Sequence, residues 1–171
     1  MLETYQPRAV LEIHSWLPEL KSGQRRLSMD GRELPSEAGA TRLDSLHVLC
    51  VAPGRWTVVS DVQLATSVIE SFAAEIAAQG AVLIDVTDGI GVLNVSGPLA
   101  RDVLSKGCGL DLHPSAFPAG RCARTRFAQL AVLIEHIDDA PSFRLYFARS
   151  YQRFLIDWIE DAAVEFQSAS Q

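Results

Sequence analysis

Two aspartates next to a predicted turn, Asp85 and Asp88, are candidates for polar binding chemistry. They lie in the segment DVTDG, in which Asp85 ends a predicted strand and Asp88 precedes a glycine. Carboxylates in this position could hold an amine or the pterin ring of a folate. An aspartate before a glycine in a tight turn more often bonds its own backbone. The turn role is therefore the favoured interpretation, and folate contact by Asp85 and Asp88 is the alternative.

Three cysteines and one histidine could bind a metal ion or carry out acid–base chemistry. Cys50, Cys108 and Cys122 form no C-x-x-C pair. Cys108, Cys122 and His113 would leave a closed zinc site one ligand short. Each cysteine is better interpreted as a small buried side chain. His113 precedes Pro114 and has no neighbours that complete a triad, so we expect it to make a structural hydrogen bond.

Motifs for phosphate, dinucleotide and zinc-protease chemistry are missing from the sequence. Gly89 and Gly91 lie between two predicted strands, and they do not open a helix as the dinucleotide fingerprint requires. Neither a phosphate-binding loop nor an H-E-x-x-H sequence occurs, and no serine lies in a nucleophile elbow. We therefore expect no catalytic residues, no cofactor and no metal in this chain.

The stretch CGLDLHPSAFPAGR, residues 108–121, is the least ordinary part of the chain. It follows a predicted helix with Pro98 at its first position and Lys106 in its last turn. Gly107 is expected to close that helix in the left-handed conformation. Prolines, glycines, a histidine and a phenylalanine without periodicity predict a loop of fixed shape that binds a ligand or a partner.

The last predicted helix carries its charges in unfavourable places. Arg149 and Arg153 lie at its beginning, and Glu160, Asp161 and Glu165 lie near its end. Both placements oppose the helix dipole, each by about 0.3–1 kcal/mol if the side chain is exposed. Binding of an acidic neighbour or an anion would explain the arginines. Chance variation of a solvated surface explains them equally well.

Hydrophobic periodicity and turn residues predict the elements that position these side chains. Strands are predicted over residues 46–51, 56–59, 81–86, 92–95, 122–130, 132–136 and 143–147. Helices are predicted over residues 61–79, capped by Asp61, over 98–106 and over 150–166, with Tyr151, Leu155, Trp158 and Ala162 on the apolar side of the last. This order predicts an α+β fold of antiparallel sheets with helices packed on one face, in two β-α-β-type halves.

The predicted domain covers residues 46–167. A poorly defined segment precedes it over residues 1–45. Residues 1–20 fit a helix or a strand there, and residues 22–40 are predicted to form loops and turns. A disordered tail is expected over residues 168–171.

Charge and hydropathy exclude two classes of partner. The 171 residues include 15 basic and 21 acidic side chains, which gives a net charge of −6 and argues against nucleic-acid binding. The longest apolar run, residues 128–134, is too short to cross a bilayer. The first residues do not resemble a secretory signal. We therefore expect a cytoplasmic protein without nucleic-acid or membrane partners.

Several segments together resemble one known family. They are APGRWTVVS, DVTDG, ARDVLSKGC, LDLHP, AFPAGRCARTR and LYFARSYQRFLIDWIEDAA, in that order. The chain is similar, over about residues 50–165, to the gamma subunit of heterotetrameric sarcosine oxidase. Gly109 departs from the family pattern, which has a proline there.

This resemblance implies a fold similar to the folate-binding domains of the glycine-cleavage T-protein. It implies alpha, beta and delta subunits as partners, with FAD, FMN, NAD and zinc held outside the gamma chain. The complex would oxidise the N-methyl group of sarcosine or a related amine. The products would be glycine, hydrogen peroxide and either formaldehyde or, with tetrahydrofolate, 5,10-methylenetetrahydrofolate. The gamma chain would serve assembly; the alternative is a stand-alone folate-binding or aminomethyltransferase-like module.

With the resemblance, a protein partner becomes the favoured ligand of the 108–121 loop, with Phe117 and Arg121 as expected anchors. The full set of predicted partner-contact residues is Lys106, Asp111, His113, Pro114, Phe117, Pro118, Arg121, Arg149, Tyr151 and Arg153.

Overall fold

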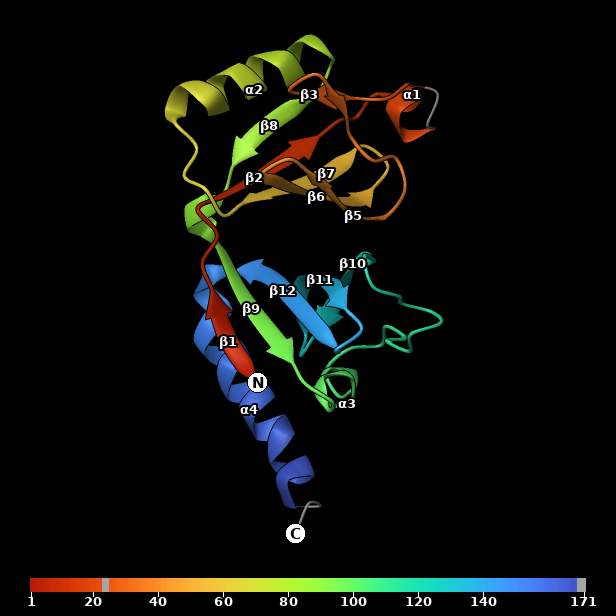
Figure 1. The fold of residues 1–171 in the computed structure, drawn as a ribbon, viewed down its shortest axis with the longest axis vertical. Helices are drawn as coiled ribbons and strands as arrows, with labels where there is room; N and C mark the ends of the chain where they lie inside the picture. Colours follow the sequence, from red (N-terminus) through yellow and green to blue (C-terminus); the bar gives the residue numbers. More distant parts are fainter. Residues whose placement is uncertain (23–24, 169–171) are drawn as a thin grey trace. The chain divides into compact units, whose positions relative to one another are not determined.

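The fold is known from a computed structural model that describes residues 1–22 and 25–168 (Figure 1). The described chain forms two compact units. Unit 1 consists of residues 1–6 and 88–171, and unit 2 of residues 7–87. Each unit is built on a five-stranded antiparallel sheet. The predicted α+β class with antiparallel sheets is therefore confirmed.

Unit 1 has the sheet order β1-β9-β12-β11-β10. Its strands are β1 Leu2–Tyr5, β9 Ile90–Ser96, β10 Cys122–Phe127, β11 Leu130–Asp138 and β12 Ser142–Ala148. Its helices are α3 Ala100–Ser105, the 3-10 turn η2 Arg149–Tyr151, and α4 Gln152–Ser168, which runs along β1 and β9 in Figure 1. Helix α4 contributes Leu155, Ile159 and Ala162 to a core formed with inward-facing residues of the sheet, among them Leu93, Val95, Phe143, Leu145 and Phe147.

Unit 2 has the sheet order β5-β6-β7-β2-β8. Its strands are β2 Ala9–His14, β5 Gly39–Leu43, β6 Leu46–Ala52, β7 Arg55–Ser60 and β8 Val82–Asp85, with a small separate hairpin of β3 Ser28–Met29 and β4 Arg32–Glu33. Its helices are α1 Pro18–Lys21 and α2 Thr66–Ala78, and the 3-10 turn η1 Thr87–Gly89 follows β8. Phe72 and Ile76 of α2 are buried in its core.

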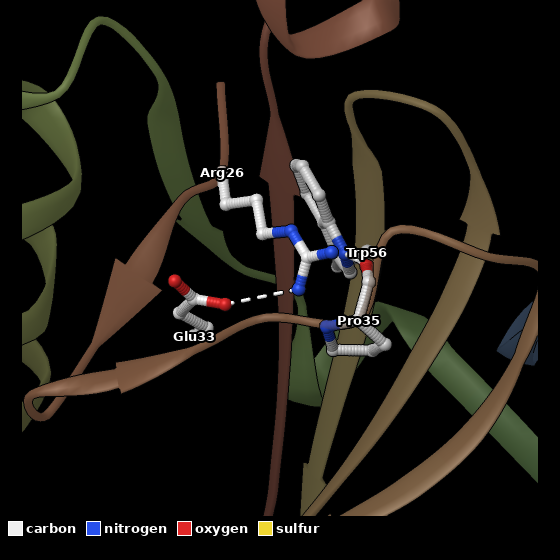
Figure 2. A network of polar contacts seen from close by, with 4 residues as sticks. All are labelled: Arg26, Glu33, Pro35 and Trp56. Carbon is white, nitrogen blue, oxygen red and sulfur yellow. Dashed lines mark hydrogen bonds and ion pairs between the residues drawn. The ribbon is translucent and has the colours of Figure 1, made fainter. Parts of the chain in front are cut away.

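The predicted hairpin around Trp56 is present in unit 2. Strands β6 and β7 pair antiparallel across the turn at Pro53 and Gly54, where Gly54 has a positive φ of 79°. The indole nitrogen of Trp56 donates a hydrogen bond to the carbonyl of Pro35 at 2.6 Å, and Arg26 pairs with Glu33 at 3.0 Å (Figure 2). Trp56 thus fixes the segment that precedes β5 to the sheet.

The units divide the chain differently from the expected domain over residues 46–167. Residues 1–45 contribute β1, which pairs with β9 of unit 1, and β2, which lies between β7 and β8 in unit 2. Residues 22–40, expected to form loops, include β3 and β4 and the start of β5. Of the expected tail, residues 169–171 lie outside the described residues.

The first helix of unit 2 begins later than predicted. Asp61 was expected to cap it, but α2 starts at Thr66 after Ala65, and no side chain caps it. The Ser60 hydroxyl donates to the carbonyl of Val62 at 2.8 Å and accepts from the Val62 amide at 3.1 Å. These bonds hold Asp61 in a turn, so the predicted cap is wrong.

Two other local expectations differ in unit 1. Tyr151 was placed on the apolar side of the last helix, but it lies in η2 and is 46% exposed. Gly107 was expected to be left-handed, yet it is needed for close packing, because an added Cβ would lie 2.5 Å from Cε2 of Phe127. Pro98 precedes α3, whose N-cap residue is Leu99.

Among the described residues, no helix has the length and apolar character needed to cross a membrane.

Candidate interaction site

The loop over residues 107–121 of unit 1 holds its shape through bonds within itself. The amide of His113 donates to Oδ1 of Asp111 at 2.9 Å. The carbonyl of His113 accepts from the amides of Ala116 and Phe117 at 2.9 and 2.8 Å. Short-range bonds of this kind convert an irregular sequence into a fixed turn. The proline-rich segment therefore has a defined backbone.

Two apolar side chains fasten this loop to the core of unit 1. Leu112 and Phe117 are each 3% exposed and belong to the core beneath the sheet. Phe117 was expected to anchor a partner. Its ring is already buried by this chain's own residues, so it stabilises the loop from the inside.

The half-buried Arg101 and the fully buried His136 also hold the loop. Nδ1 of His136 lies 2.9 Å from the carbonyl oxygen of Phe117, and Nε2 lies 3.1 Å from Nη2 of Arg101. Because a carbonyl only accepts and a guanidinium only donates, Nδ1 carries the proton and Nε2 accepts. Nη1 of Arg101 also donates to the carbonyl of Leu112 at 2.7 Å. Leu112 and Phe117 are thus held through their backbone carbonyls as well as through their buried side chains.

Aromatic rings complete the packing around His136, which is 0% exposed. Its ring stacks on Phe143 with centroids 4.7 Å apart, and it lies nearly parallel to Phe117 at 6.3 Å. The guanidinium of Arg101 lies 5.1 Å from the centroid of Phe143. Sequence reasoning missed this pair. Alternation along β11 was the available signal, since it places His136 on the same face as Val132 and Ile134.

The outer surface of the loop includes five of the predicted contact residues. Asp111, His113, Pro114, Pro118 and Arg121 are all exposed. Nδ1 of His113 lies 2.8 Å from Oγ of Ser115, so this ring is bound to its own loop. The structural hydrogen bond expected for His113 is present. The exposed polar side chains of the loop are therefore carried on a fixed backbone.

Lys106 acts between the two helices of unit 1. Its Nζ donates to the carbonyl of Ala162 at 2.8 Å, pairs with the carboxylate of Glu165, and lies 4.5 Å from the ring centroid of Phe166. Ala162, Glu165 and Phe166 all belong to α4. Lys106 therefore joins the end of α3 to α4.

Three predicted contact residues near the start of the last helix, Arg149, Tyr151 and Arg153, differ in their surroundings. Nη2 of Arg149 donates to the carbonyl of Ile90 at 3.1 Å and ties η2 to β9. Arg153 is exposed and pairs with Asp157 one turn later, Nε to Oδ2 at 2.9 Å. The hydrogen bond and charge of Asp157 raise the pKa of Arg153. Tyr151 lies exposed between the two arginines.

Asp85 is engaged by the backbone turn that follows β8. Its Oδ1 accepts from the amide of Thr87 at 3.0 Å and from the Thr87 hydroxyl at 2.6 Å. This geometry is the turn role favoured for Asp85, and it occupies one of the oxygens that a pterin would need. Asp88 is exposed within η1.

The three cysteines are free thiols. Burial raises the pKa of Cys50 to about 11, and burial also raises the pKa of Cys108 above its ordinary value. A thiol that stays protonated is a poor nucleophile and a poor metal ligand. Within residues 1–22 and 25–168, no three His, Cys, Asp or Glu side chains gather as a metal site.

A buried polar pair on the other face of the unit 1 sheet was also missed. The Tyr146 hydroxyl donates to Oε2 of Glu135 at 2.8 Å, and the two residues are 4% and 1% exposed. Burial, assisted by the charge of Glu135, raises the pKa of Tyr146 well above its usual range. The phenol is therefore a permanent donor, and the pair is a structural contact.

Comparison with known families agrees with the motifs and the fold. A profile of the sarcosine oxidase, gamma subunit family matches residues 31–165. The chain belongs to this family. The gamma-family chain is 31% identical over 142 residues to the sarcosine oxidase subunit gamma of Corynebacterium sp. (strain P-1), covering 81% of this chain and 68% of that protein. The predicted identity as a sarcosine oxidase gamma subunit is confirmed.

Solved structures place the fold of the gamma-family chain. It matches a chain of the heterotetrameric sarcosine oxidase from Corynebacterium sp. U-96 in complex with pyrrole 2-carboxylate, with a TM-score of 0.82 and 23% identity over 97% of this chain and 84% of that one. It also matches the glycine cleavage system aminomethyltransferase T from Bartonella henselae, with a TM-score of 0.63 and 15% identity over 92% of this chain and 44% of that one. The predicted likeness to the T-protein fold is confirmed.

Proposed function

We propose that this chain is a non-catalytic assembly subunit of a sarcosine oxidase-type enzyme. The family match over residues 31–165 carries the proposal. Its partners are the alpha, beta and delta subunits, and the assembled enzyme oxidises the N-methyl group of sarcosine or a related amine. FAD, FMN, NAD and zinc are bound by the other subunits, and tetrahydrofolate serves as the acceptor of the one-carbon unit. The complex acts in the cytoplasm.

The state of the candidate chemical groups supports a non-catalytic role. His136 is buried with both ring nitrogens engaged by Phe117 and Arg101. His113 is bound within its own loop, and burial holds Cys50 and Cys108 in the protonated form. A general base or nucleophile has to reach a substrate, and these groups are committed to the fold.

The engagement of Asp85 by Thr87 disfavours a stand-alone folate-binding module. Both bonds go to Oδ1, so a pterin would have only Oδ2 of Asp85 left to bind. We therefore place folate use in the assembled enzyme.

The outer surface of the 107–121 loop is the proposed primary contact with a larger subunit. Its backbone is fixed before binding, so association does not have to order it. Asp111, His113 and Arg121 supply polar contacts, and Pro114 and Pro118 supply rigid apolar ones. Arg149, Tyr151, Arg153 and Lys106 are the remaining proposed contacts, although Arg149 and Lys106 also bind within this chain.

Co-expression with the other subunits tests the proposed function. The complete complex, purified through a tag on another subunit, is expected to contain this chain in a fixed ratio and to oxidise sarcosine. Omission of this chain should lower the yield of assembled complex. The turnover per bound flavin of whatever complex still forms should stay within about twofold, because a group essential to the chemistry would cost far more. The isolated chain should show neither flavin absorbance nor oxidation.

A matched pair of variants separates assembly from folding. Arg121→Glu changes an exposed residue of the loop, and Arg42→Glu makes the same change on exposed β5 of unit 2. The first should reduce recovery of the complex and the second should not. Sarcosine oxidation by the chain alone, or failure of the wild-type chain to co-purify, would contradict the proposal.

A further inference from the structure

A groove in unit 1 lies outside the 107–121 loop. Its volume is about 550 Å³. One wall is the later half of α4, with Ile159, Ala163 and Val164, and the other is the start of α3, with Leu99 and Val103. Most of its lining is apolar. Leu99 and Val164 are 42% and 55% exposed, so this apolar surface faces solvent.

A second hollow continues this groove along α4. Its volume is about 490 Å³, and it shares Leu2 and Glu160 with the first. Glu3, Thr4, Leu93 and Ile156 complete its lining. The combined surface, which we call the α4 groove, is apolar toward Leu99 and carries two carboxylates, Glu3 and Glu160, toward Ile156.

The acidic side chains near the α4 groove are not explained by the stability of the helix. Glu160, Asp161 and Glu165 lie in the later turns of α4, where negative charge opposes the helix dipole. Glu165 is balanced by Lys106. Within the described part of the chain, no ion pair joins Glu3 or Asp161 to a cation, and Glu160 forms none although its charge helps to raise the pKa of Arg153. This excess of negative charge beside an apolar groove is complementary to a basic amphipathic segment.

We propose that the α4 groove binds a segment of a partner subunit that carries apolar side chains at one end and Lys or Arg at the other. The apolar end lies between Leu99 and Val164, and the cations face Glu3 and Glu160. This inference rests on the proposed function, since it assigns a second docking surface to the same subunit. It identifies the partner by chemistry, and it is independent of the 107–121 loop.

Four variants in the co-expressed complex test this surface. Leu99→Ser removes the apolar side chain and introduces a residue favoured at a helix N-cap, and Val62→Ser is its exposed counterpart in unit 2. Glu160→Lys reverses the charge in the groove, and Glu70→Lys does the same on exposed α2. Each groove variant should lower recovery of this chain with the tagged partner by about tenfold, because a lost apolar contact or a reversed ion pair changes affinity by that order. Both controls should match the wild type, and the amount of soluble chain should be equal in all four.

A photo-crosslink from the wild-type background identifies the occupant without depending on a weakened variant. A benzophenone side chain at position 164 should react with a segment of another subunit that contains Lys or Arg near apolar residues. Reaction with a second copy of this chain, or with a segment that lacks Lys and Arg, overturns the inference. Unchanged recovery of both groove variants also overturns it. If the wild-type chain does not co-purify at all, the proposed function itself fails, which is a different result.

Discussion

The loop over residues 107–121 of unit 1 and the segment over residues 25–38 of unit 2 are both irregular, and they are fixed to their sheets by different contacts. In unit 2, the neutral side chains of Gln79 and Trp56 and the carboxylate of Glu75 bind the segment's backbone. Gln79 accepts from the amide of Ser28 and donates to its carbonyl, each at 2.8 Å, and Trp56 donates to Pro35 at 2.6 Å. In unit 1, the carbonyl of Leu112 accepts from the guanidinium of Arg101. The carbonyl of Phe117 accepts from the fully buried imidazole of His136.

This difference indicates how strongly each segment depends on single residues. The amide of Gln79 pairs with the backbone of Ser28 as a neighbouring strand would. Gln79 is half-exposed, so water can replace these hydrogen bonds if the side chain is lost. His136 is fully buried, so removal of the Arg101 guanidinium leaves Nε2 of His136 without its donor at a site closed to solvent. We therefore expect the proposed docking loop of unit 1 to be the more sensitive of the two.

Substitution of Phe117 should give the largest effect. Phe117→Ala empties a core position and should lower the free energy of unfolding by about 3 kcal/mol, as for other buried phenylalanines. Pro118→Ala, next to it and exposed, should change it by less than about 0.5 kcal/mol. Urea denaturation of the complex-free chain, or thermal unfolding within the complex, measures the difference. Equal stability of both variants would show that Phe117 is not held by the core.

Removal of the guanidinium should come next. Arg101→Met keeps an apolar stem but leaves the carbonyl of Leu112 and Nε2 of His136 without their donor, at a cost of about 2 kcal/mol. Arg42→Met on exposed β5 is the matched control and should be almost neutral. Limited proteolysis should show earlier cleavage within residues 107–121 for the Arg101 variant alone. Cleavage at the wild-type rate would show that the loop does not depend on Arg101.

Two hairpin turns extend the comparison to the backbone. In unit 2, β3 and β4 are joined by Asp30 and Gly31 with φ of 55° and 67°, and in unit 1, β10 and β11 are joined by Ala128 and Gln129 with φ of 47° and 71°. A positive φ strains residues that carry a Cβ. Gly adopts it without this strain, and Asp tolerates it better than Ala or Gln. Gln129→Gly should therefore raise the free energy of unfolding by about 1 kcal/mol.

The reverse substitution is the control for this turn. Gly31→Ala places a Cβ in open space, since no atom lies within 4 Å of where that Cβ would lie, so conformation alone decides its effect. It should lower the free energy of unfolding by about 1 kcal/mol. Effects of the same sign in the two turns would contradict the assignment of strain to the left-handed backbone.

The effect that is smallest at neutral pH, and grows only in alkaline solution, concerns the pH dependence of unit 2. Burial raises the pKa of Cys50 from 9.0 to about 11. The unfolded chain then loses this proton before the folded chain does, so stability falls as pH rises from about 9 to about 11. The wild type should lose stability more steeply across this range than Cys50→Ala, in denaturation curves recorded at each pH. Parallel curves would indicate that the Cys50 thiol titrates normally.

Local patterns were sufficient for the fold class and for most elements. Turn residues at Pro53 and Gly54 located a hairpin, and periodicity located α4 together with its buried residues Leu155 and Ala162. These signals depend on neighbours within a few positions along the chain, so they survive without knowledge of the tertiary structure. The turn signal at Gly31 was equally local, and the expectation of loops and turns over residues 22–40 used it but missed the short strands β3 and β4 on either side.

The sequence by itself determined the antiparallel α+β class, the family and the unusual loop over residues 108–121. Only the tertiary structure decided which way the loop's side chains face, with Phe117 inside and His113 outside. Arg101 and His136 lie 35 positions apart, and Gln79 and Ser28 lie 51 positions apart. Contacts over such separations depend on how strands pair and how helices lie over them. No local pattern contains that information, because the spacing of residues along a chain does not specify which distant side chain fills the neighbouring space.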